Sequence, residues 1–536
     1  MPNLKALFAS LFLALIFLSV AVSRWGLPTD NYFAGSTKQQ FLRNSQILFL
    51  LTGAILTALL FLDFLENFTS EIKLGGRAVV ALFILIASVA VTLCVASALK
   101  SEAPLGCPGC NILIISVEQF KATRSEVYGY SGEATPFLQS FSKSSLVFDR
   151  AFSSAPMQYP SGEASLLSSQ TPATHRMIFL WNNSTIFFPD SRRLNPLFFS
   201  EAKKNGYKTA YFSRPMPAVE LFSGSLLDNA SIDKISLGDP FGDAAAEIRG
   251  TEPDQKFAFY IGVPGDLLQT TFRTGDGAEH RLDELEVNSV SGRISLGPNG
   301  QEIPISIGTE LISKAESGYD AYLRRIDSGI SKVVSALSEK KLLERTIVVV
   351  TASGGAAVDE KALQVLDREN NGISGVAQYV PFGTGSKAAS KARIPLLIRI
   401  PGIPGARVSS QTAATVDVLP TVFWLAGIPL DSPGTEGRNL LIQTSERALP
   451  AAFETICEAE VSPNGSLELI LQRSFVYGNS RVSLPCPCIE PGNCSIESFD
   501  IDYETSRETA VYPPRAAAQL PQSIQLSLPV GGVFSG

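Results

Sequence analysis

The chain has 536 residues, a net charge of −7 and 45% hydrophobic residues, so it is long enough for a large α/β domain with further segments beside it. The acidic balance argues against nucleic acid as a partner. The mean hydropathy is positive, which is high for a soluble protein, and the excess lies near the N-terminus.

Three apolar segments near the N-terminus predict membrane spans. They cover about residues 6–23, 45–65 and 78–99, and each has roughly the ~20 residues that a helix needs to cross a bilayer. A cleaved signal peptide is the alternative for the first segment, but the two that follow favour a transmembrane anchor over residues 1–100. The positive charges in the loops do not decide its orientation.

Six of the seven cysteines lie beyond the third predicted span, in two clusters. They are Cys107, Cys110, Cys457, Cys486, Cys488 and Cys494. An even number favours disulfides in an oxidising compartment, with the pairing left open, and a zinc site is the alternative. We therefore expect an integral membrane protein, interpreted as one of a bacterial inner membrane, whose large domain lies on the periplasmic side.

Alternating strands and helices follow a Pro/Gly linker at 101–110 and predict an α/β domain over residues 111–464. Strand patterns cover 112–117, 146–152, 208–212, 256–263, 346–351 and 394–400, and helical patterns cover 129–145, 319–341 and 415–426. This alternation predicts a doubly wound sheet with helices on both faces. Residues 465–536, with their Pro, Cys and short β-like runs, predict a small C-terminal subdomain and tail.

One strand end lacks the residues that a catalytic site would need. The strand 346–351 ends in Ala352-Ser353-Gly354-Gly355, with no carboxylate and no imidazole. In open α/β sheets, catalytic groups normally follow the carboxyl ends of buried strands. The whole chain has two histidines: His175, which follows a helical segment, and His280, in a charged stretch typical of a solvated loop.

Seven segments in the expected order, spread over most of residues 111–512, resemble the sulfatase branch of the alkaline phosphatase superfamily. They include Phe148-Asp149-Arg150-Ala151-Phe152 with Pro160-Ser161, the helix that carries Asp327, and Gly437-Arg438-Asn439-Leu440. The resemblance implies that family's α/β fold with a small closing subdomain. It also implies a divalent metal, held by carboxylates and imidazoles, against which a nucleophile attacks sulfur or phosphorus.

The chain departs from this family at the positions that carry the chemistry. Glu118 stands at the first metal-ligand position, where Asp is usual, and Gln158 stands at the nucleophile position. Gly162 replaces the arginine of the nucleophile motif. Ser353 and Gly354 replace the late metal-binding Asp-His pair.

Three interpretations follow. The first is a membrane-anchored pseudoenzyme without a cofactor, which binds an envelope lipid, a glycan or a membrane protein, or regulates at the cell envelope. The second is an active metal-dependent sulfatase, or a phosphoryl or phosphoethanolamine-type transferase or hydrolase, with a rebuilt site. The third is a structural component of a membrane complex, which an exposed apolar surface would favour.

The rebuilt site would use Ser161 or Ser165 as the nucleophile and a set of carboxylates to hold calcium or magnesium. The candidate ligands are Glu118, Glu163, Asp327, Asp359 and Glu360. Ser161 and Glu163 have a structural alternative as helix caps, and Asp327 as a partner of Arg324 or Arg325. In a pseudoenzyme, the cleft could retain an anion through Lys121, Arg124 and Lys387 or Lys391, whose alternative is as ordinary surface cations.

Overall fold

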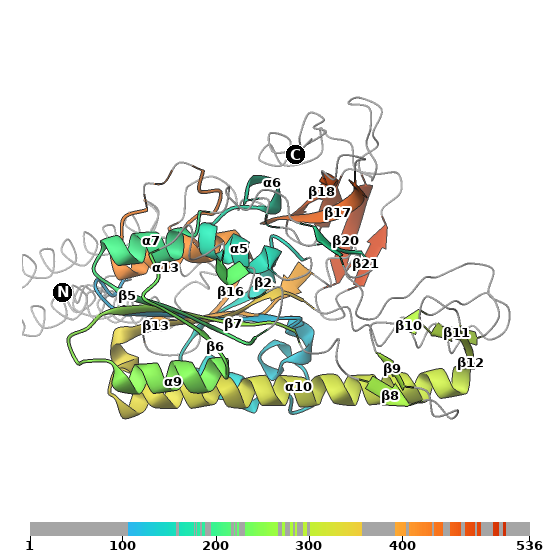
Figure 1. Ribbon diagram of the computed structural model, residues 1–536, viewed down its shortest axis with the longest axis horizontal. Coiled ribbons are helices and arrows are strands. Elements are labelled where there is room, and N and C mark those ends of the chain that lie inside the picture. Colours follow the sequence, from blue (N-terminus) through green and yellow to red (C-terminus); the bar gives the residue numbers. More distant parts are fainter. Residues whose placement is uncertain are drawn as a thin grey trace, which may run out of the picture. The chain divides into compact units, whose positions relative to one another are not determined.

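The computed structural model describes most of the predicted α/β domain (Figure 1). Apart from gaps at single positions, side chains are described over 106–156, 160–177, 195–215, 219–224, 231–265, 317–355, 392–403, 407–442 and 474–476; backbone elements are also assigned within 180–187, 271–316 and 451–510. The three predicted spans and Gln158, Asp359, Glu360, Lys387 and Lys391 lie outside the described residues. Within those ranges no helix is both long and apolar enough to cross a membrane.

The chain divides into two compact units. One comprises Met1–Ser101 with Leu441–Arg447, and the other comprises Glu102–Leu440 with Ala448–Gly536. All strands and helices named below belong to the second unit.

The centre of the second unit is a nine-stranded sheet in the order β14-β2-β15-β13-β1-β7-β5-β6, with β16 paired to β2. Its strands are β1 (Asn111–Glu118), β2 (Leu146–Phe152), β5 (Lys208–Ser213), β6 (Lys234–Leu237), β7 (Phe257–Val263), β13 (Thr346–Gly354), β14 (Arg393–Ile394), β15 (Leu396–Arg399) and β16 (Arg407–Ala414). The six predicted strand segments are therefore confirmed. β1, β7 and β13 are buried at nearly every position because both faces of the sheet are covered.

The sheet is mixed, where the sequence predicted a doubly wound sheet. β13, β1, β7, β5 and β6 are parallel, whereas β15 runs antiparallel to both β13 and β2. A run of apolar residues carries no information about strand direction, so its pattern could not reveal this reversal. β16 was not predicted, because its first half, Arg407–Gln411, is polar and only partly buried.

Helices cover both faces of the sheet, as predicted (Figure 1). On one face lie α4 (Pro136–Ser142), α9 (Pro240–Gly250) and α10 (Ile305–Glu339); on the other lie α5 (Ser161–Ser168), α7 (Leu197–Lys204) and α13 (Val418–Ala426). α10 extends the predicted helix 319–341 towards its N-terminus. It buries Tyr322, Ile326, Ile330, Val333 and Leu337, which recur at helical spacing.

Shorter elements complete the unit. They are η1 (Ala122–Arg124), η2 (Glu126–Tyr128), α6 (Pro172–His175), η7 (Leu343–Arg345), η8 (Thr415–Asp417), the pairs β3 (Leu180–Asn182) with β4 (Thr185–Phe187) and β8 (Thr271–Arg273) with β9 (Glu279–Arg281), and the three strands β10 (Leu285–Glu286), β11 (Arg293–Leu296) and β12 (Gln301–Pro304). A five-stranded antiparallel sheet follows, formed by β17 (Ala451–Val461), β18 (Leu467–Tyr477), β19 (Ser480–Ser483), β20 (Glu497–Asp502) and β21 (Arg507–Ala510).

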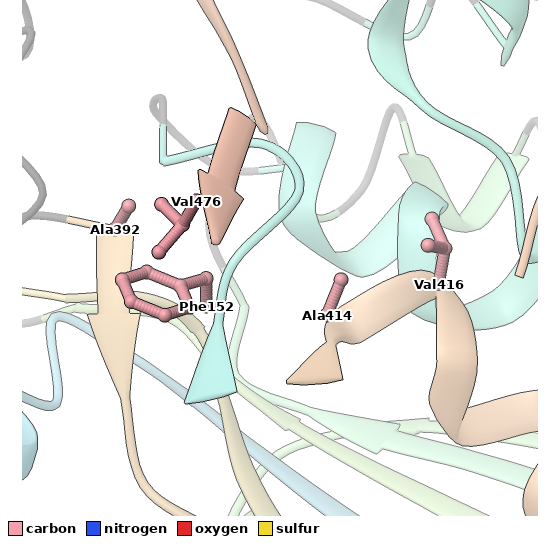
Figure 2. Close-up of a cluster of buried hydrophobic side chains, with 5 residues drawn as sticks. All are labelled: Phe152, Ala392, Ala414, Val416 and Val476. Atoms are coloured by element: carbon pink, nitrogen blue, oxygen red, sulfur yellow. The ribbon is translucent and has the colours of Figure 1, made fainter. Parts of the chain in front are cut away.

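A small apolar cluster joins this second sheet to the main sheet. Val476 of β18 is fully buried and points at Phe152, the last residue of β2, beside Ala392 (Figure 2). Ala414, the last residue of β16, and Val416, two residues further on, complete the cluster. The C-terminal strands are therefore packed onto the main domain by buried apolar surface.

Two of the six cysteines are paired. Cys107 and Cys110 form a disulfide immediately before β1. The side chains of the other four lie outside the described residues.

Candidate functional site

The carboxyl ends of three strands and the start of one helix meet at one end of the main sheet. Glu118, the last residue of β1, lies opposite Gly354 of β13, and Val117 lies opposite Val263 of β7. The first turn of α5 packs on the end of β13. The structure thus brings together several of the positions singled out in the sequence: Glu118, Gly162, Glu163, Ser353 and Gly354.

The start of α5 lies directly on the end of β13, with no room for a side chain between them. A Cβ atom at Gly162 would lie 2.7 Å from the carbonyl carbon and 2.8 Å from the Cβ of Ser353, and closer still to its carbonyl oxygen. That carbonyl oxygen accepts a hydrogen bond from the Ser153 hydroxyl. Backbone atoms therefore occupy the space that the arginine of the family motif would enter.

Glu163, the residue that follows Gly162 in α5, lies in a buried cluster of hydroxyl groups. Ser116 Oγ of β1 donates to its Oε1 at 3.0 Å, and the Tyr260 hydroxyl of β7 donates to its Oε2. Gly262 leaves space for this cluster, because a Cβ there would lie 3.4 Å from Glu163 Oε2.

Burial determines the charge of Glu163. Loss of hydration raises the pKa of its carboxyl to about 8, although the hydrogen bonds from Tyr260 and Ser116 favour the charged form. The neighbouring Ser353 hydroxyl lowers the pKa slightly, without a hydrogen bond of regular geometry. At neutral pH Glu163 is mostly a neutral acid, which makes it a poor ligand for a cation.

Glu118 is held by backbone groups. Its Oε2 accepts a hydrogen bond from the Gly265 amide at 2.8 Å. Its carbonyl oxygen accepts a hydrogen bond from the Tyr322 hydroxyl at 3.0 Å. The Tyr319 hydroxyl donates to the Gln119 carbonyl and accepts from the Lys121 amide. Two tyrosines of α10 thus fix the loop after β1 through its main chain.

Ser165 and His175 form a buried pair, but with the wrong tautomer for general-base catalysis. Nδ1 of His175 accepts the Met177 amide at 2.9 Å, so the ring proton is on Nε2, which lies 3.1 Å from Ser165 Oγ. His175 therefore donates to Ser165 and cannot take its proton. Burial lowers the pKa of His175 to about 3, so the ring stays neutral.

Asp327 caps a helix. Its two oxygens accept hydrogen bonds from the amides of Phe137 and Leu138, at 2.8 and 2.9 Å, in the first turn of α4. The suggested pairing with Arg324 or Arg325 is replaced by these main-chain bonds, because α4 packs against α10 with its free amides towards the carboxyl group.

Replacing Asp327 with alanine should leave both α4 amides without an acceptor and lower the free energy of unfolding by about 1–2 kcal/mol. Urea unfolding of the full-length protein, followed by circular dichroism, measures the loss. Asp254→Ala, at an exposed turn before β7, is the matched control and should change stability little. Equal stability of the two variants would contradict the capping role.

Of the predicted anion-binding cations, Arg124 has partners within the protein. Arg124 is buried, donates to the Tyr130 hydroxyl at 2.8 Å and lies 3.6 Å from Asp320. Lys121 is also buried. His280 lies in β9, and its side chain is outside the described residues.

The described residues do not fit a divalent metal. Among them, no three Asp, Glu, His or Cys side chains gather in a way that could hold an ion. Glu118 accepts a hydrogen bond from an amide, Glu163 is surrounded by hydroxyl groups and Asp327 caps α4, so each of these carboxyl groups already has partners within the protein.

Sequence reasoning missed Ser116 and Tyr260. Both are hydroxyl-bearing residues inside otherwise apolar strands, and that is the one signal that could have revealed them: a buried polar group needs a partner. The partner itself could not be named from the sequence.

Comparison with known proteins agrees with this architecture. Residues 110–215 and 269–428 match the family model described as Sulfatase. The chain is 27% identical to a choline-sulfatase of Rhizobium meliloti over 34% of its length and 32% of that protein, and 22% identical to arylsulfatase K of Danio rerio over 64% of its length and 69% of that protein. Its match thus spans about a third of the choline-sulfatase.

A solved structure shows the same fold. A 2-O GAG sulfatase superposes with a TM-score of 0.52 at 17% identity, covering 73% of this chain and 85% of that one. A second solved structure, of a sulfatase-like protein from Bacteroides thetaiotaomicron, has the same mixed α/β fold, with a TM-score of 0.50 at 15% identity over 78% of this chain and 90% of that one. Residues 110–215 and 269–428 thus form a domain of the sulfatase family.

Proposed function

We propose that this chain is a membrane-anchored, catalytically inactive sulfatase-family protein that binds a partner or regulates at the cell envelope. The observation that carries the proposal is the direct packing of Gly162 on Ser353, which fills the space at the start of α5 with main-chain atoms.

The neighbouring groups support the same conclusion. A metal-dependent ester hydrolysis needs a charged ligand set and an activated nucleophile. Here Glu163 is mostly neutral at pH 7, and His175 presents an N–H to Ser165 rather than a lone pair. Neither group can activate an attacking hydroxyl in this arrangement.

One observation favours the second candidate, an active sulfatase or phosphoryl-type transferase or hydrolase with a rebuilt site. Ser161 Oγ, at the first residue of α5, is fully buried and has no hydrogen-bond partner among the residues that the structure describes. An uncommitted hydroxyl could act as a nucleophile if Asp359 or Glu360 supplied a ligand or base.

Enzyme assays separate the two candidates. We expect the full-length protein, purified in detergent, to show no turnover of 4-nitrophenyl sulfate or 4-nitrophenyl phosphate with Mg²⁺, Ca²⁺, Mn²⁺ or Zn²⁺. An active sulfatase assayed in parallel is the positive control. Turnover that disappears in Ser161→Ala would overturn the proposal and favour the rebuilt site; turnover that persists in that variant would overturn it as well.

The membrane setting follows from the sequence. Spans at about 6–23, 45–65 and 78–99 would anchor the chain, and the Cys107–Cys110 disulfide suits a domain on the periplasmic side of a bacterial inner membrane. The partner would be an envelope lipid, a glycan or a membrane protein.

A further inference from the structure

The linker to the predicted membrane anchor is fastened to the domain at a defined place. The Cys107 amide donates to the Leu425 carbonyl at 2.7 Å, and the Gly109 amide donates to the Ala426 carbonyl at 2.9 Å. Both acceptors are in the last turn of α13, where carbonyl groups lack partners within the helix. The disulfide closes this linker turn.

The residue that follows α13 also contacts the linker turn. Gly427 has a left-handed backbone, with φ of 71°, and ends the helix. A Cβ there would lie 3.2 Å from the Pro108 side chain, so the helix end and the linker turn are in close contact. The linker is therefore held by main-chain bonds, packing and a covalent bridge together.

The contact between the linker turn and the end of α13 lies at the end of the sheet where the parallel strands begin. Cys110 directly precedes β1, and the side chain of Asn111 ties the start of β1 to the starts of its neighbours, donating to Thr346 of β13 and accepting from the Phe257 amide of β7. The candidate site lies at the other end of β1. The strand has 8 residues, which span ~26 Å at ~3.3 Å per residue.

The length of chain between the anchor and the linker turn is short. The third predicted span ends at Leu99, and residues 100–106 can extend over at most ~24 Å at ~3.4 Å per residue. The end of the sheet where the parallel strands begin must therefore lie near the bilayer surface if the third span is inserted.

A half-exposed tryptophan lies at the same end of the sheet. Trp424 is in the last turn of α13, next to the two residues that hold the linker, and 40% of it is exposed. Tryptophan is enriched at the membrane–water interface, because its ring is apolar and its N–H can meet polar headgroups.

We propose that the end of α13, with the linker turn and Trp424, is the membrane-facing surface of the domain, and that Trp424 lies among phospholipid headgroups. This rests on the proposed membrane anchoring. The candidate site then lies at the opposite end of β1, away from the membrane-facing surface.

Lipid quenching tests the orientation. The full-length protein with Trp25 and Trp181 replaced by phenylalanine keeps Trp424 as its sole tryptophan. In vesicles of phosphatidylcholine and phosphatidylglycerol, lipids brominated near the headgroup should reduce its fluorescence roughly by half relative to unbrominated lipids. A matched reporter, Ser131→Trp in a background with all three native tryptophans replaced by phenylalanine, lies in the loop region after β1 and should be quenched little.

The outcomes separate the two proposals. If the protein resists alkaline carbonate extraction but Trp424 is not quenched, or if both reporters are quenched equally, the orientation is wrong and the anchoring stands. If carbonate extracts the protein, anchoring and orientation both fail. Should a single-tryptophan variant not fold, the quenching difference between the native protein and Trp424→Phe gives the same measurement.

Discussion

Gly162→Ala is expected to lower the free energy of unfolding by about 1–3 kcal/mol or more, the cost of forcing extra atoms into a packed interior. The added methyl group would come within 3 Å of the Ser353 main chain, whose carbonyl oxygen is fixed by Ser153. Backbone cannot rotate away as a flexible side chain would, so α5 and β13 must separate. Urea unfolding of the full-length protein, followed by circular dichroism, measures the change.

Gly250→Ala is the matched control for this substitution. Gly250 is the last residue of α9, and a Cβ there would meet no atom within 4 Å outside its own helix. That variant should be neutral or slightly more stable, because alanine restricts the unfolded chain. If Gly162→Ala behaves in the same way, α5 and β13 are not in direct contact, and the main argument for an inactive site is lost.

Glu163→Gln is expected to stabilise the protein at pH 8 by a few kcal/mol and to remove a fall in stability between pH 4.5 and about 8. The pKa of this carboxyl rises from 4.5 in the unfolded chain to about 8 in the folded one. Below pH 4.5 both states hold the proton. Between pH 4.5 and about 8 only the folded state keeps it, so stability falls by up to about 1.4 kcal/mol per pH unit. Urea unfolding from pH 4 to 9 measures the slope.

His175→Gln is the control for the pH series, because it should leave the slope above about pH 6.5 unchanged. Burial lowers the pKa of His175 from 6.5 to about 3, so its contribution to stability is lost as the pH falls through that range. A native-like slope between pH 6.5 and about 8 in Glu163→Gln would show that another group keeps the proton and would exclude Glu163 as its site.

The strands of the main sheet could be predicted because burial on two faces leaves a nearly continuous apolar pattern, as in Ile112–Ile115. β16 was not predicted because its first half, Arg407–Gln411, is mostly polar and only partly buried, as is usual for a strand at the edge of a sheet. The reversed direction of β15 escaped it because an apolar run reads the same both ways. Fold class therefore follows from local pattern, and strand order and direction depend on pairings far apart in the chain.

The candidate site, like the sheet, was predictable only in part from the local sequence. The rule that functional groups follow strand ends, together with the family resemblance, predicts from the sequence that Glu118, Gly162 and Ser353 lie close together. The partners of Glu163 come from positions 47 and 97 residues away, and nothing local reveals which hydroxyl groups will meet it. Asp327 was suggested as a ligand because its spacing fits the family, yet its role depends on where α4 docks.

Tyr319 and Tyr322 have a consequence for how this loop could change over evolutionary time. Among the described residues, their hydroxyl groups bond main-chain atoms of residues 118–121, so these bonds do not depend on which side chains the loop carries. Substitutions at these positions leave all three bonds intact. Selection for a particular ligand at Glu118 could therefore lapse without unfolding the loop, and the scaffold could outlast the chemistry for which it was first shaped.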